Sequence, residues 1–325
     1  MADAADSKSA ALAGVRVRVP PSVLRFFDPR TLAQARRLIR SSGAAQAVAV
    51  SVVCCGAMVF GCKDQAKESA ARAVSDDAFL VDLVEKDVAE VERGLPQGAN
   101  QMALLLRDGG DPRQDVAGVR RALVRMRRDV VDLNVAKSTF FALADADGTA
   151  IRNDLEEDVM AGQNLVTIFP ALAKARSGFV TTTGSFPNAD VRSGPDKDWI
   201  AATPVRRTDG SVGALLVTGW SYRYFARHLQ ATLQSRLIDE SKAAGSDGKL
   251  PVYYVAVFDA SGVYSAPLTP RVDEDALATQ NLVAKTASGP AQGTIRITER
   301  DFGFAAARTP KVAPETGVVV LRSEL

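Results

Sequence analysis

Few residues in this chain of 325 could carry out chemistry, and their surroundings do not favour it. His228 is the only histidine, and the surrounding YRYFARHLQATLQ has a helical pattern, which favours a packing or surface role over that of a base or metal ligand. The sequence contains no GxSxG, HExxH or Walker-type phosphate loop. We therefore expect no enzyme, no catalytic residue, no cofactor and no metal site.

One acidic segment, DADGTAIRND from Asp145 to Asp154, has part of the spacing of a calcium-binding EF-hand loop. Its first ligand position would be Leu143, which offers no side-chain oxygen, and the flanking sequences alternate as strands do rather than as helices. Asp and Gly tolerate the positive φ that tight turns require. The segment is therefore predicted to be a hairpin turn between two strands.

All three cysteines, Cys54, Cys55 and Cys62, lie within a run of 19 uncharged residues from Ala44 to Cys62. A length of about 20 apolar residues is needed to cross a membrane as a helix. Residues 1–42 carry eight Lys or Arg against three Asp, a bias that retains the preceding segment in the cytoplasm. An exported domain without disulfides is ordinary if its core is large enough.

Two interpretations of this run remain open. The favoured one is a retained transmembrane helix over 43–62, with a basic cytoplasmic segment over 1–42. The other is a cleaved signal, because VFGC at its end resembles the bacterial lipoprotein signal in which the cysteine, here Cys62, is lipidated. Phe60 and the long preceding segment depart from that pattern. Either way, residues from 63 onward are expected outside the cytoplasm, in the periplasm.

The body of the chain is slightly acidic, with 32 Lys and Arg against 35 Asp and Glu after Ser42, hence a net charge of −3. Phosphate binding requires clustered positive charge, which this region lacks. A nucleic acid partner is therefore not expected.

The first exported part, residues 63–137, is predicted to be a helical stalk. Valines recur every three or four residues between Asp64 and Arg93, GLPQG is predicted to end that helix, and a second apolar seam runs from about Arg113 to Leu133. The two seams are expected to pack on each other, and they permit a homodimer through the stalk.

The remainder is predicted to be α+β, with two modules of mostly antiparallel sheet at 138–245 and 246–325. DADG at Asp145 corresponds to DASG at Asp259, and IAATPV at Ile200 to AAARTPKV at Ala305. A glycine-marked aliphatic strand follows in each copy, as GALLV and then GVVVL. Order, turn chemistry and spacing recur together, which indicates a repeat.

These segments resemble the Cache and PAS-like sensor domains that bacterial receptors and sensor kinases display outside the membrane. FFALADADGTAI resembles the opening hairpin of such a domain, and WIAATPVRRTDGSVGALLVTGWSYRYF its closing strands and following helix. The resemblance implies a small-molecule pocket between the sheet and a helical cover, with binding shifting the long helix. No kinase, cyclase or methyl-accepting region follows Leu325, so signalling is expected to need a partner protein.

By analogy with that family, the predicted ligand-binding residues of the first module are Arg152, Phe169, Trp199 and Tyr222. An aromatic wall with one cation suits a small organic anion. DKDWIAA has no Arg beside an aromatic pair, so a site that clamps an amino-acid carboxylate is not expected. The alternative function is an envelope structural or scaffold lipoprotein whose modules bind only a protein partner.

Overall fold

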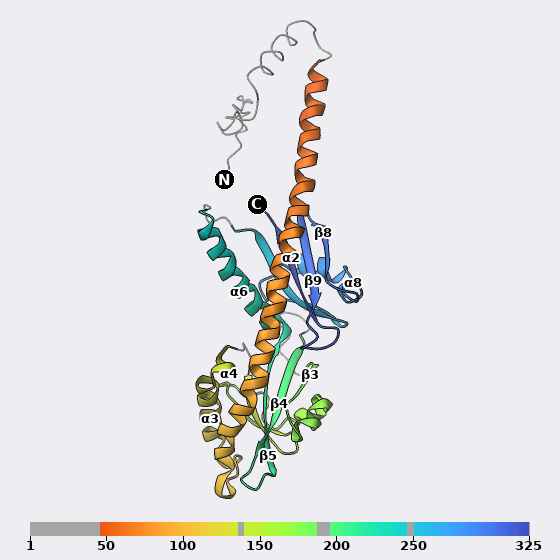
Figure 1. Ribbon diagram of the computed structural model, residues 1–325. Coiled ribbons are helices and arrows are strands. Elements are labelled where there is room, and N and C mark those ends of the chain that lie inside the picture. Colours follow the sequence, from red (N-terminus) through yellow and green to blue (C-terminus); the bar gives the residue numbers. More distant parts are fainter. Residues whose placement is uncertain (1–45, 136–139, 187–195, 246–249, 325) are drawn as a thin grey trace, which may run out of the picture. The chain divides into compact units, whose positions relative to one another are not determined.

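The computed structural model describes residues 46–135, 140–186, 196–245 and 250–324. The chain divides into two units, residues 1–60 and 61–325, and the second unit contains both modules (Figure 1). The predicted basic segment 1–42, residues 43–45 and the side chains of the rest of the apolar run, Cys62 included, lie outside what the structure describes. Among the described residues, no helix combines the length and hydrophobicity that crossing a membrane requires.

The first described element is a single long helix, α2 (Gln46–Met102), which contains Pro96. The prediction that GLPQG ends the helix was therefore wrong. The two glycines of that segment serve close packing instead: a Cβ at Gly98 would lie 2.6 Å from the sulfur of Met126, and one at Gly94 would lie 2.9 Å from the Cβ of Asp132. The neighbouring helices occupy the space that a side chain would need.

After α2 come a 3-10 helix, η2 (Ala103–Gly109), and the helices α3 (Val116–Asp129) and α4 (Val131–Val135). The side chain of Asp115 caps α3 by accepting a hydrogen bond from the Gly118 N–H at 2.8 Å. The second predicted seam is interrupted at Val130, which has extended backbone angles. Its buried residues share one core with those of α2, which confirms that the two seams pack together.

The two modules contain five-stranded antiparallel sheets with the same strand order, which confirms the predicted repeat. The first sheet has the order β2-β1-β5-β4-β3 and the second β7-β6-β10-β9-β8. The strands are β1 (Phe140–Asp145), β2 (Ala150–Asn153), β3 (Val180–Gly184), β4 (Asp198–Arg206), β5 (Val212–Ser221), β6 (Val252–Asp259), β7 (Gly262–Ser265), β8 (Ala291–Ile297), β9 (Arg300–Arg308) and β10 (Gly317–Ser323).

Helices follow the second strand of each sheet at equivalent places: α5 (Leu165–Ile168) and η3 (Pro170–Arg176) in the first module, and α7 (Arg271–Ala278) and α8 (Leu282–Lys285) in the second. The helix α6 (Tyr222–Ala243) lies between the two modules, after β5 and before β6. Between α7 and α8 the helical path breaks at Asn281, whose φ of 50° is left-handed.

Each sheet has two buried faces, which we call the helix face and the cover face. The helix faces of both sheets share one continuous core with α2, α3 and α6. The cover face of the first sheet packs on α5 and η3, and that of the second sheet on α7 and α8. Both faces of each sheet are therefore apolar, and α2 contributes to the core of both modules (Figure 1).

The backbone of α2 comes very close to the second sheet at Gly303 of β9. A Cβ there would lie 2.0 Å from the backbone nitrogen of Ala70, so the helix backbone rests directly on the strand. Polar contacts fix the register on either side: Arg322 of β10 pairs with Asp76 at 2.5 Å, and the Glu324 N–H donates to the Ser69 hydroxyl at 3.1 Å. The second module is thus attached to one particular turn of α2.

We expect Gly303→Ala to destabilise the chain by about 3 kcal/mol, because the added methyl group collides with backbone atoms that only a displacement of α2 can relieve. Urea unfolding monitored by circular dichroism measures this change. Gly178→Ala is the matched control, since a Cβ at Gly178 meets nothing within 4 Å. Equal stability of the two variants would show that α2 does not rest on β9.

Candidate functional site

The cover face of the first sheet carries three aromatic rings. Phe186 packs edge-on against Phe169 and Phe140, with ring centroids 5.0 and 6.0 Å apart. Phe169 precedes η3, whereas Phe140 begins β1. Gly184 of β3 makes room for this cluster, because a Cβ there would lie 2.7 Å from the ring of Phe169.

A buried acid, Asp198, lies on the same face as these rings. Residues alternate along β4, and Asp198 shares its face with Ile200 and Ala202, which belong to the cover-face core. Its carboxylate accepts a hydrogen bond from the backbone of Phe186. Burial and then the nearby Asp196 raise the pKa of Asp198, the hydrogen bond from Phe186 opposes them, and the resulting pKa is about 7.

An acid of this kind can change protonation state near neutral pH. When protonated it both donates and accepts hydrogen bonds, and when ionised in an apolar setting it favours a cationic partner. A carboxyl group beside three aromatic rings therefore suits a small molecule with an amino group and an apolar body.

The structure places the four residues predicted to bind ligand in three different environments. Phe169 is buried on the cover face, in the aromatic cluster. Arg152 lies on the edge strand β2, where it pairs with Asp158 at 3.0 Å and donates to the Leu155 carbonyl at 2.8 Å. Trp199 and Tyr222 are fully buried on the helix face.

The two helix-face aromatics have packing partners of their own. Trp199 stacks on Trp220 with centroids 4.1 Å apart, and the Tyr222 hydroxyl lies 3.2 Å from that of Thr316 in the second module. Sequence reasoning missed Asp198. The alternation of D-W-I-A-A was the available signal, because it places the residue before Trp199 on the opposite face.

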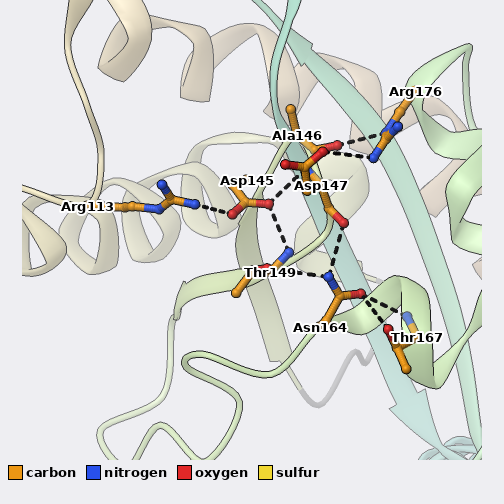
Figure 2. Close-up of polar contacts among 8 residues, drawn as sticks. All are labelled: Arg113, Asp145, Ala146, Asp147, Thr149, Asn164, Thr167 and Arg176. Carbon is orange, nitrogen blue, oxygen red and sulfur yellow. Dashed lines mark hydrogen bonds and ion pairs between the residues drawn. The ribbon is translucent and has the colours of Figure 1, made fainter.

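The DADG turn between β1 and β2 is a hairpin turn, as predicted. Figure 2 shows Asp145 accepting hydrogen bonds from the N–H groups of Asp147 and Thr149, at 2.8 and 2.9 Å, while Arg113 pairs with its other oxygen. Arg176 bonds the Ala146 carbonyl at 2.8 Å (Figure 2). These contacts fasten the hairpin to the loop before α3 and to η3.

The equivalent turn in the second module uses the same local bonds but a different outer partner. Asp259 accepts from the Ser261 N–H at 2.7 Å, as Asp145 does from Asp147. Its second oxygen binds the Lys197 ammonium at 2.5 Å, one residue before β4 of the first module. The repeated turn has thus become a contact between the two modules.

A second ion pair crosses the same junction. Arg223, at the start of α6, binds Glu274 of α7 through two hydrogen bonds of 2.7 and 2.9 Å. The Ser265 N–H also donates to Glu274 at 3.0 Å. Burial alone would raise the pKa of Glu274, but the hydrogen bonds from Arg223 and Ser265 hold it below its usual value.

The only histidine, His228 of α6, packs against α2. Its Nε2 lies 2.9 Å from the carboxylate of Asp87, which is completely buried. Among the described residues, no group of three or more His, Cys, Asp or Glu is placed to hold a metal ion.

In fold, the chain is similar to double Cache sensor domains of chemoreceptors and histidine kinases. No family model matches the sequence. No curated protein matches it either.

Three of the similar structures illustrate the match. The ligand-binding domain of the Campylobacter jejuni chemoreceptor Tlp3 with L-valine has 10% identity and a TM-score of 0.47, covering 81% of this chain and 96% of that one. The ligand-binding domain of the Pseudomonas aeruginosa amino acid chemoreceptor PctC with GABA has 16% identity and a TM-score of 0.42, covering 76% of this chain and 96% of that one. The sensor domain of the V. cholerae histidine kinase DctB has 14% identity and a TM-score of 0.44, covering 77% of this chain and 95% of that one. The likeness concerns the fold, and each ligand is a property of that protein.

The raised pKa of Asp198 predicts a specific pH dependence of stability. Between about pH 4 and 7 the unfolded chain loses this proton while the folded chain keeps it, so stability falls as pH rises through that window and is level above it. We expect Asp198→Asn to be more stable than the natural chain at pH 8, by roughly 4 kcal/mol at most, and equal to it at pH 4. Thermal unfolding at both pH values measures the difference, and a gain of the same size at both would contradict the assignment.

The junction pair predicts a large cost for a single substitution. Arg223→Met leaves the Glu274 carboxylate buried without its cation, which we expect to cost about 3–5 kcal/mol, with part of the loss recovered by adding Glu274→Gln. Arg296→Met is the control, because Arg296 is largely exposed and 3.9 Å from Asp301, and it should change stability by less than about 1 kcal/mol. Equal costs for Arg223→Met and the control would refute a structural role for the pair.

Proposed function

We propose that this protein is a membrane-anchored sensor whose first module binds a small molecule outside the cytoplasm and whose signal passes to a partner protein. The observation that supports this most is the shared core of α2. Its buried side chains pack in one cluster with the helix faces of both sheets. A change in either module must therefore be accommodated by α2.

The proposed ligand site is the cover face of the first sheet. Phe169, one of the residues predicted from the sequence, lies there beside Phe186 and the buried acid Asp198. Arg152, which suggested a small organic anion, is already neutralised by Asp158. The charges therefore favour a ligand with an amino group over an anion.

The contributions proposed for the other predicted residues are indirect. Trp199 lies on the opposite face of β4 from Asp198, and Tyr222 contacts both Thr316 and Tyr264 of the second module. A ligand that displaces β4 would press on these aromatics and on the Lys197–Asp259 contact. In this proposal, Trp199 and Tyr222 convey the effect of binding to the junction and to α2.

Anchoring and output complete the proposal. Residues 43–62 would hold the chain in the membrane, either as a helix or through lipidated Cys62, and the continuous α2 begins within this segment at Gln46. Movement of α2 would reach the membrane and there a partner protein, or a second copy paired through the helices. Periplasmic localisation follows from the basic segment at residues 1–42.

A ligand screen tests the sensory function directly. We expect at least one compound in a panel of amino acids, primary amines and organic acids to raise the melting temperature of the purified chain, with the amines the most effective class. Asp198→Asn should then weaken binding of that compound at least tenfold in calorimetry, because a hydrogen bond to a charged group is lost.

Two comparisons sharpen this experiment. Phe169→Leu, which keeps an apolar side chain in the cluster, should also weaken binding, whereas Asp239→Asn on the exposed part of α6 should not. If no compound raises the melting temperature, the sensory function is refuted. If one does and both cover-face variants bind it normally, the site is elsewhere in the chain.

A further inference from the structure

A cavity lies in the second module, on the other side of its sheet from α7 and α8. It has a volume of about 380 Å³ and is lined by one stretch of α2, by the edge strand β8 with the residue before it, and by the adjacent strand β9. The lining is mostly apolar, and it includes Val74, Asp77, Val81, Asp82, Ala291 and Ala305. A volume of this order accommodates a small organic molecule.

One buried carboxyl group in this lining lacks the partners that such a group needs. Asp77 is 3% exposed, and its Oδ1 accepts no hydrogen bond. The preceding residue, Asp76, is buried to the same degree but is paired with Arg322 at 2.5 Å. Of these two adjacent acids on α2, Asp76 is neutralised by Arg322 of the second module, whereas Asp77 faces the cavity without a cation.

The charges around the cavity all have the same sign. Asp77 and Asp82 are the titratable residues in the lining, and the lining contributed by β8 and β9 consists of Pro, Ala and Gln. Burial and then the neighbouring Asp76 raise the pKa of Asp77 well above its ordinary value. The raised pKa favours the neutral form of the Asp77 carboxyl group over the ionised form, because an ionised carboxylate is costly to bury without a cation.

We propose that this cavity binds a small organic ammonium ion, with its N–H groups donating to the Asp77 carboxylate and its apolar body against Val74, Val81 and Ala305. Asp82, at the exposed rim, attracts the cation. Wherever Asp77 is still protonated, binding releases that proton to solvent and the ammonium replaces it as the compensating charge. This site is separate from the cover face of the first module and does not depend on a ligand there.

Occupancy of this cavity would have a structural consequence. Its two walls come from α2 and from β8–β9, so a bound ion would join the helix to the edge of the second sheet. Of the existing contacts, Gly303 lies on β9 itself and Arg322 on the neighbouring strand β10. A ligand would therefore strengthen the attachment of α2 to the second module.

The test uses the full chain and n-pentylammonium chloride as the probe, with 1-pentanol and hexanoate as neutral and anionic analogues of similar length. We expect calorimetry at pH 8 to detect binding of pentylammonium alone. Affinity should fall about tenfold for each pH unit below the pKa of Asp77, because the carboxyl must first lose its proton. Binding of 1-pentanol with equal affinity, or no binding of pentylammonium, would overturn the proposal.

Variants locate the site. Asp77→Asn keeps the shape of the side chain and should reduce pentylammonium affinity at least tenfold, and Ala291→Leu should do the same by filling the cavity; melting temperatures establish that both fold. Asp239→Asn removes an exposed acid elsewhere and should bind normally. Unchanged binding by Asp77→Asn overturns the proposal. The proposal is also overturned if the natural chain is a dimer in solution and the Ala291→Leu variant is a monomer, because the cavity would then belong to an interface between two copies. Retention of binding by Asp198→Asn would separate this site from the one on the first module.

Discussion

The structure depends on the burial of one helix against two sheets. Valine and leucine residues on α2 pack in one cluster with the helix faces of both modules. Burying an apolar side chain of this size stabilises a fold by about 1.5–3 kcal/mol. Neither sheet could bury its helix face without α2, so the modules are joined by a shared core rather than by a linker.

The two modules have the same topology, but α2 contacts them differently. Near the first module the contacts are side-chain packing, together with the glycines that let α3 and α4 approach. Near the second module they include backbone contact at Gly303 and the Asp76–Arg322 ion pair. Apolar contacts tolerate small shifts better than a buried ion pair does, since the pair loses its compensation when it is separated.

Much of this fold could be predicted from the sequence, because its signals are local. Alternation and turn residues indicated the strands, and the recurrence of DADG as DASG indicated the repeat, which the identical strand orders confirm. The continuity of α2 through Gly94, Pro96 and Gly98 could not be predicted. The glycines are explained by Met126 and Asp132, which are distant in sequence, and only tertiary packing distinguishes a close approach from a helix end.

The same limit applies to the candidate sites. The type of a residue suggested which aromatics could contact a ligand, but Trp199 and Tyr222 proved to lie on the helix face and Asp198 on the cover face. Charged residues were harder still, because their role depends on a partner from another module. Lys197 and Arg223 pair with Asp259 and Glu274, whereas Asp77 has no such cation. Whether a buried carboxylate has a cationic partner depends on residues that are distant in sequence. Carboxylates with such a partner, like Asp259 and Glu274, stabilise the fold, whereas those without one, like Asp77, are the candidates for binding a ligand.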